Sequence, residues 1–268
     1  MAIPTTTPKK LRILCLHGHR HNSALMELHM APLRRALGDS AEFVFVNGVS
    51  PARGEPDALV RRQHMDKAPF YEWYDVRRLE EHEDQDDEWF FQYDGLNDAL
   101  VYMDEQLQRL GPFDAVVGFS QGAVLMTILS MCYEHKSKQQ LQGSGSASPW
   151  WKLCISVCGW RVRDYSWKFL FEGDDGEPLR VPLPSIHLAG KKDPLHCESE
   201  ELVHQFAGDN DGAVGGLKKL FFEFDEGHQF PSEARHGELY RELAKSIHEM
   251  CGEDKSHQAQ QTQTYSRL

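Results

Sequence analysis

The sequence predicts an α/β protein with the α/β-hydrolase fold, a doubly wound and mainly parallel sheet of about six strands with helices on both faces. Three observations lead to this prediction. Short apolar runs alternate with longer segments of helical periodicity along most of the chain. The runs are apolar at nearly every position, as in parallel strands that are buried on both faces. A Gly-x-Ser-x-Gly pentapeptide at residues 118–122 stands between one such run and a predicted helix.

The predicted strands are short apolar runs ended by Gly, Pro or polar residues. In chain order they are residues 11–16, 41–46, 113–119, 152–158, 185–189 and 219–224. The predicted helices have apolar residues three or four positions apart, and they are residues 22–37, 94–110, 121–133, 198–206 and 232–250. Catalytic residues are then expected where the strands end, at the carboxyl edge of the sheet.

A chain of 268 residues has room for one large α/β domain. We expect a disordered lead-in at residues 1–10, a single domain at residues 11–250 and a disordered tail at residues 251–268, because both ends are polar. Two irregular insertions at residues 48–93 and 159–182 are rich in aromatic side chains. Because connections of this length are usually lids or binding loops, we expect the insertions to form the walls of a substrate pocket.

Composition and charge exclude several classes of protein. A formal net charge of −12 argues against nucleic acid as a partner, because that affinity depends mainly on Lys and Arg. No apolar stretch approaches the roughly 18–20 residues of a membrane span. The six cysteines lie mostly in apolar runs without Cys-x-x-Cys spacing, and the first ten residues have no apolar signal core. We therefore expect reduced cysteines and an intracellular protein, which is cytoplasmic unless the peroxisomal signal described below directs it elsewhere.

Ser120 is the predicted nucleophile. It is the central residue of Gly118-Phe119-Ser120-Gln121-Gly122, with an apolar strand before it and an apolar helix after it. The pattern requires this context, because the serine must stand on a very tight strand-to-helix turn that only flanking glycines allow to close.

His228 is the predicted general base among the 14 histidines of the chain. A serine hydroxyl needs an adjacent base, and the chain order of this fold is serine, acid, histidine. His228 follows the strand at residues 219–224 and a short turn, which places it on a loop at the edge of the sheet. The other histidines after the serine precede this strand or lie on helices or in the tail.

Asp193 is the predicted acid that orients the histidine. It follows the strand at residues 185–189 and precedes a helix, so its carboxylate can accept the hydrogen on Nδ1 of His228. Two alternatives are Asp164, which follows another strand, and Asp225. Asp225 is so close to the histidine in sequence that the chain would have to fold back on itself.

The oxyanion hole is expected to consist of two backbone N–H groups. One is that of Gln121, directly after the nucleophile, and the other comes from the loop after the first strand, residues 17–22. His19 is the first choice for this second donor, with Arg20 next, because Gly18 permits a close approach.

The same loop raises a metal-site alternative. His17, His19 and His21 alternate, and three imidazoles can hold a zinc ion that activates water. The alternation points the side chains the same way only while the strand persists, and Gly18 marks its end. No His-Glu-x-x-His motif completes such a site, so no metal is predicted.

With these motifs in place, the chain resembles the FSH family of serine hydrolases, which are α/β hydrolases of fungi, plants and animals. The matching pieces are Leu14–Gly18 followed by Asn22, Tyr71–Tyr74, Gly118–Ala123, Gly190–Asp193 and Gly227–His228. The resemblance implies hydrolysis of carboxylic esters or thioesters of acyl chains without a metal or organic cofactor. Fungal members resemble thioesterases for polyketide chains, and animal members resemble esterases for long alkyl esters. The chain departs from the family pattern at His19 and His21, where an aromatic residue and Gln are common.

The last three residues, Ser266, Arg267 and Leu268, resemble the Ser-Lys-Leu signal that a peroxisomal import receptor reads.

The motifs and the family resemblance together lead us to expect first a serine esterase or thioesterase, which forms an acyl-enzyme on Ser120 with a small-molecule acyl substrate. A peroxisomal acyl-CoA thioesterase and a non-catalytic ligand-binding module of the same fold are the alternatives.

Overall fold

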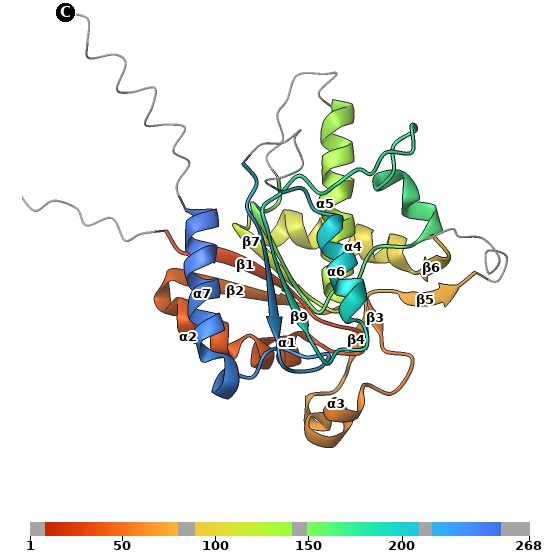
Figure 1. Ribbon diagram of the computed structural model, residues 1–268. Helices are drawn as coiled ribbons and strands as arrows, with labels where there is room; N and C mark the ends of the chain where they lie inside the picture. Colours follow the sequence, from red (N-terminus) through yellow and green to blue (C-terminus); the bar gives the residue numbers. More distant parts are fainter. Residues whose placement is uncertain (1–8, 80–88, 141–148, 209–215, 253–268) are drawn as a thin grey trace, which may run out of the picture.

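The computed structural model describes residues 9–79, 89–140, 149–208 and 216–252. Its centre is a six-stranded sheet in the order β10-β9-β8-β7-β1-β2, in which every neighbouring pair is parallel (Figure 1). The strands are β1 Leu11–Leu16, β2 Ala41–Val46, β7 Ala115–Phe119, β8 Leu153–Val157, β9 Ser185–Gly190 and β10 Lys219–Phe224. All six lie where the sequence predicts them, and the predicted fold class is confirmed.

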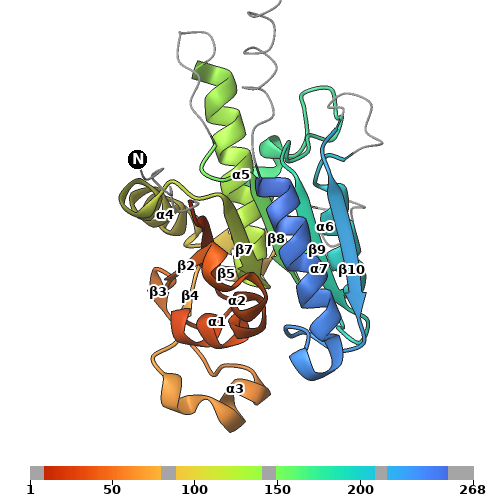
Figure 2. The ribbon, with the colours of Figure 1, turned by 90° about the vertical axis from the view of Figure 1, so that its left-hand side faces the viewer.

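Helices cover both faces of this sheet (Figures 1 and 2). One face carries α1 Ser23–His29, α2 Ala31–Leu37 and α7 Glu233–Cys251, and the other carries α4 Leu96–Leu110, α5 Gln121–Gln140 and α6 His196–His204. Successive side chains of β1 alternate between the two cores. Ile13 and Cys15 belong to the first core, whereas Leu14 and Leu16 belong to the second, as the two-residue period of a strand requires.

Two predicted helices differ from the observed ones. The single helix expected over residues 22–37 is wrong, because α1 and α2 are separate helices that meet at Met30. Pro32 stands in the first turn of α2, where its missing N–H costs nothing, but inside one continuous helix its ring would clash with the carbonyl of Leu28. The helix expected at residues 121–133 continues to Gln140.

The insertion at residues 48–93 is less irregular than expected, because it contains short elements. They are β3 Ser50–Pro51, α3 Ala58–Gln63, the 3₁₀ turn η2 Met65–Lys67, β4 Tyr71–Glu72, β5 Asp75–Arg78 and β6 Phe91–Asp94. The strands form two antiparallel pairs, β3 with β4 and β5 with β6. Buried Asp164 joins the two insertions, since its carboxylate accepts the backbone N–H of Tyr93. The second insertion contains the 3₁₀ helix η4 Tyr165–Leu170, and another 3₁₀ turn, η1 Gly38–Ser40, precedes β2.

Some of the predictions lie outside the described residues. They are the lead-in up to residue 8, the acidic segment 80–88, the tail from residue 253 and the C-terminal tripeptide. In the part of the chain that is described, no helix combines the length and the apolar character that a membrane crossing requires.

Candidate active site

Ser120 stands between the end of β7 and the start of α5, as the elbow motif predicts. Its φ angle is 53°, in the left-handed region, which costs an L-residue about 1–2 kcal/mol. Two hydrogen bonds hold this backbone, because the N–H of Ser120 donates to the carbonyl of Val157 at 2.9 Å and its own carbonyl accepts from Ala123 at 2.9 Å. The strained turn is therefore fixed by the neighbouring strand β8 and by the first turn of α5.

The two glycines of the motif are required by close backbone contacts. A Cβ atom on Gly118 would lie 2.5 Å from the backbone of Ala123, and one on Gly122 would lie 2.4 Å from the carbonyl oxygen of Leu16. Any side chain at either position would force α5 away from β7 or β1. The glycines thus allow the helix to begin directly behind the serine.

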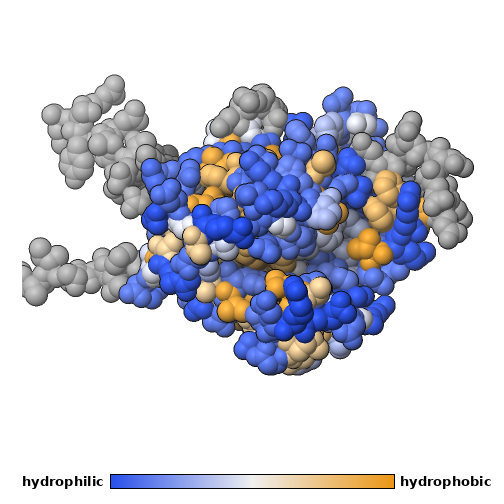
Figure 3. Space-filling view, turned by 60° about the horizontal axis from the view of Figure 1, so that its bottom comes forward, coloured by the Kyte–Doolittle hydropathy of each residue, from blue (hydrophilic) through white to orange (hydrophobic). Residues whose placement is uncertain are grey.

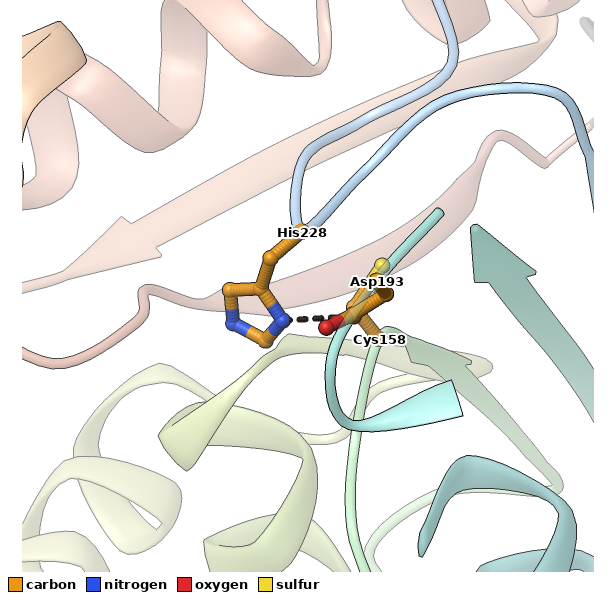
Figure 4. Close-up of side chains that lie close together, drawn as sticks. All are labelled: Cys158, Asp193 and His228. Carbon is orange, nitrogen blue, oxygen red and sulfur yellow. Dashed lines mark hydrogen bonds and ion pairs between the residues drawn. The ribbon is translucent and has the colours of Figure 1, made fainter. Parts of the chain in front are cut away.

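The structure brings the three predicted catalytic residues into one hydrogen-bonded chain. His228 Nε2 lies 2.8 Å from Ser120 Oγ, and its Nδ1 lies 2.6 Å from Asp193 Oδ2. Figure 4 shows Asp193 on the Nδ1 side of the imidazole, with Cys158 next to it. With Nδ1 donating to the carboxylate, Nε2 is left free to accept the serine hydrogen.

The carboxylate of Asp193 is buried and held on both oxygens. Oδ1 accepts the N–H of Leu195 at 2.8 Å, while Oδ2 faces His228. Burial alone would raise the pKa of Asp193, but the hydrogen bonds from His228 and Leu195 outweigh it and hold the pKa below its ordinary value. Burial raises the pKa of the neighbouring Cys158 thiol to about 12, so this group is neutral beside the acid.

The two alternative acids have other partners. Asp225 is exposed and forms an ion pair with Lys192 Nζ at 3.0 Å. Asp164 is buried at the contact between the insertions, where it accepts the backbone N–H groups of Tyr93 and Ser166. Of the three candidates, Asp193 is the one hydrogen-bonded to His228.

Of the two residues predicted for the oxyanion hole, Gln121 follows the serine directly and His19 lies on a loop that contacts the serine. Gln121 is the first residue of α5, so its backbone N–H has no acceptor one turn earlier in the helix. On the other side, a Cβ atom on Gly18 would lie 3.3 Å from Ser120 Cβ, which places the loop that carries His19 against the nucleophile.

The end of the molecule to which the arrows of β9 and β10 point in Figure 1 has a mostly hydrophilic surface with separate apolar patches (Figure 3).

The three alternating histidines do not share a site, because each ring has its own partners. His17 is buried between a backbone carbonyl at 2.7 Å and a backbone N–H at 2.8 Å, and burial lowers its pKa to about 3. His19 Nε2 lies 3.3 Å from Glu72, and His21 Nε2 lies 3.0 Å from Asp57. These contacts do not fit the zinc alternative.

Glu72 was not among the predicted site residues, yet it is buried and its carboxylate lies against the loop after β1. Its one signal in the sequence is a charged residue inside the aromatic cluster Tyr71–Tyr74. Its burial depends on contacts between segments far apart in the chain, and such contacts leave no local pattern.

A parallel six-stranded sheet with a serine elbow at its carboxyl edge, hydrogen-bonded to a histidine, defines a serine hydrolase of the α/β-hydrolase class. The chain belongs to the family described as Serine hydrolase (FSH1), whose model matches residues 5–239. The resemblance found in the sequence is thereby confirmed.

Relatives agree with this membership, and a solved structure agrees with the fold. The chain is 28% identical to Esterase OVCA2 of Danio rerio, over 88% of this chain and 96% of the relative. It is 25% identical to a Dihydromonacolin L-[lovastatin nonaketide synthase] thioesterase of Aspergillus terreus, over 87% and 91%. Acyl-protein thioesterase 2 of Zea mays has the same fold, with a TM-score of 0.55 and 19% identity over 92% and 97% of the two chains. The predicted class, an ester or thioester hydrolase, is confirmed.

Proposed function

We propose that Ser120, His228 and Asp193 form a catalytic triad that hydrolyses esters or thioesters of acyl chains through an acyl-enzyme. The observation that carries this proposal is the continuous hydrogen-bonded chain from Ser120 Oγ through the imidazole to the buried carboxylate. The packing of the histidine supports it, because the ring of Phe119 lies beside the imidazole of His228 with the ring centroids 5.5 Å apart.

In the first half of the reaction, Ser120 Oγ attacks the carbonyl carbon while His228 Nε2 takes the serine proton. The carbonyl oxygen becomes negative, and the N–H groups of Gln121 and His19 stabilise it. His228 then returns the proton to the leaving alcohol or thiol as the bond to that group breaks. The acyl chain remains as an ester on Ser120.

In the second half, water replaces the alcohol or thiol. His228 removes a proton from the water as its oxygen attacks the acyl carbon, and then protonates Ser120 Oγ as the carboxylic acid leaves. Asp193 stays ionised throughout, in keeping with a pKa held below its ordinary value. Because protein groups supply every proton transfer, we expect hydrolysis to be insensitive to chelators such as EDTA.

Labelling with a fluorophosphonate probe tests the nucleophile. We expect stoichiometric labelling of the folded wild-type protein at Ser120, and loss of both labelling and p-nitrophenyl ester hydrolysis in Ser120→Ala. Ser166→Ala removes an exposed serine elsewhere and should behave as the wild type. Absence of labelling in the folded protein would contradict the proposal and favour a non-catalytic ligand-binding module.

We propose an acyl ester or thioester as the substrate class, in line with the esterase and thioesterase relatives. A panel of p-nitrophenyl esters and acyl-CoAs of graded chain length, compared by kcat/KM, tests it. An acyl-CoA thioesterase would prefer the thioesters at equal chain length, and an esterase would prefer the oxygen esters.

We also propose that Ser266, Arg267 and Leu268 direct import into peroxisomes. The argument is the sequence alone, because a small residue, a basic residue and leucine form the tripeptide that the import receptor reads. A fluorescent protein fused in front of the chain should colocalise with a peroxisomal marker, and Leu268→Ala should abolish this. A diffuse signal for the unaltered chain would contradict the proposal.

A further inference from the structure

The segment Glu72–Tyr74 contacts the oxyanion residue Gln121 through its backbone. The N–H of Trp73 donates to Gln121 Oε1 at 3.1 Å, and Gln121 Nε2 donates to the carbonyl of Tyr74 at 2.7 Å. Both ends of the Gln121 side chain amide are therefore used to hold this segment. These two hydrogen bonds tie residue 121, at the start of α5, to the segment.

The same segment contacts the loop that carries the second proposed oxyanion donor. Trp73 Nε1 donates to the carbonyl of His17 at 2.9 Å, and the two rings stack with centroids 4.9 Å apart. The carboxylate of Glu72 then lies 3.3 Å from Nε2 of His19 and 3.7 Å from Nε of Arg20. One short segment thus contacts both sides of the proposed oxyanion hole.

Glu72 is the charged member of this segment, and its surroundings are those of a compensated buried charge. Its side chain is 3% exposed, and Arg53 Nε lies 3.7 Å from the second carboxylate oxygen. Taking a carboxylate out of water is costly unless opposite charges surround it. Among the described residues, Glu72 Oε2 has no hydrogen-bond donor, so its attraction to Arg20 is mainly one of charge.

The loop needs such an attraction because its backbone is strained. Arg20 has a φ angle of 54°, in the left-handed region that residues other than glycine rarely adopt. Surrounding contacts must hold a strained residue of this kind in place. The neighbouring charge of Glu72 supplies one on the side of the loop that faces β4.

We infer that Glu72 is a positioning residue of the oxyanion hole. Its buried charge holds Arg20, the neighbour of His19, against β4, so that the N–H of His19 stays directed at the oxygen of the tetrahedral intermediate. The inference rests on the proposed function, since it concerns the same reaction, and Glu72 itself need not touch the substrate.

The variant Glu72→Gln tests this role, because glutamine keeps the size of the side chain and removes its charge. Loss of a whole oxyanion donor costs about 10²–10³ in kcat, so a displaced donor should lower kcat by about tenfold or more. KM should stay within about twofold, because the ground-state ester needs the donor least. Affinity for a boronic acid, which mimics the tetrahedral intermediate, should fall in parallel with kcat.

Glu238→Gln is the matched control. It makes the same Glu-to-Gln change at a side chain on α7 that is 95% exposed, and it should leave kcat unchanged. His19→Gln is the second variant, and it keeps the backbone N–H but removes the imidazole that faces Glu72. The effects of the two changes should combine less than additively in the double variant, because both remove the contact between Glu72 and His19.

Wild-type kcat and boronate affinity in both Glu72→Gln and His19→Gln would overturn the inference, as would a change confined to KM. If Glu72→Gln does not fold, His19→Gln carries the same test. Failure of the proposed function has a different result, in which the wild-type protein itself is not labelled at Ser120.

Discussion

Replacing Asp193 by asparagine should misplace one hydrogen and thereby stop catalysis. Oδ1 of Asp193 accepts the N–H of Leu195 at 2.8 Å, and Oδ2 faces His228 Nδ1 at 2.6 Å. In Asp193→Asn, the amide oxygen of the new side chain would have to keep the first contact, because turning the amide would leave a buried N–H unpaired at a cost of about 1–3 kcal/mol. Its NH₂ group therefore faces the imidazole.

An NH₂ group at this position reverses the tautomer of His228. Nδ1 must then accept a hydrogen bond, so Nε2 carries the hydrogen and can no longer take the proton of Ser120, which lies 2.8 Å away. The equivalent change in a serine protease costs on the order of 10⁴ in kcat, equal to about 5 kcal/mol in the activation free energy. We expect a loss of that order in kcat/KM for a short p-nitrophenyl ester.

The assay is steady-state hydrolysis together with the rate of fluorophosphonate labelling, and both should fall. Asp225→Asn is the matched control, since it removes an exposed acid three residues before the histidine. Circular dichroism checks that Asp193→Asn is folded. A folded Asp193→Asn variant that keeps more than about a tenth of the wild-type kcat/KM would refute the tautomer argument.

Three further predictions concern stability and thiol reactivity. Gly122→Ala should lower the free energy of unfolding, measured in urea, by about 1–3 kcal/mol, because the added Cβ would meet the backbone of β1. Gly237→Ala is the control in open space, since the nearest atom to its added Cβ is 3.9 Å away, and it should raise the free energy of unfolding by about 0.5–1 kcal/mol. Because the pKa of Asp193 is lowered in the folded protein, its ionised form stabilises the fold above the unfolded-state pKa of about 3.9, and this contribution is lost as the pH falls through the lower folded value. Urea unfolding should therefore show the stability gap between wild type and Asp193→Asn shrinking below about pH 4, and a constant gap would contradict this. Iodoacetamide at neutral pH should modify exposed Cys197 well before Cys158, whose pKa burial raises to about 12, as peptide mapping would show.

The sheet and the three hydrogen-bonded residues could be predicted because each has a local signal. A strand buried on both faces is apolar at consecutive positions, as in β7, where all five residues are buried. Ser120 is marked by glycines that close contacts require. Asp193 and His228 each follow a strand, and parallel strands bring their carboxyl ends to the same edge.

The division between α1 and α2 had a local signal, but the apolar periodicity outweighed it. Leu25, Leu28 and Leu33 keep helical spacing across Met30, and Pro32 is the one residue that breaks the pattern. A proline is allowed in the first turn of a helix and disruptive inside one, so its position decides between one helix and two. Periodicity alone cannot make that distinction.

Glu72 shows why the surroundings of a catalytic residue are harder to predict than the residue itself. The turn that carries Ser120 is formed by neighbouring residues, so the five-residue motif at residues 118–122 describes it completely. The contacts around the proposed oxyanion donors join residues 17–20, 53, 72–74 and 121, and each depends on where the insertion folds back onto the sheet. A buried charge of this kind is costly, so its neighbours must compensate it, and only the assembled fold shows which side chains they are. The same reasoning predicts that changes at Glu72 or Trp73 will lower kcat through the proposed oxyanion hole while the hydrogen bonds of Ser120, His228 and Asp193 remain intact.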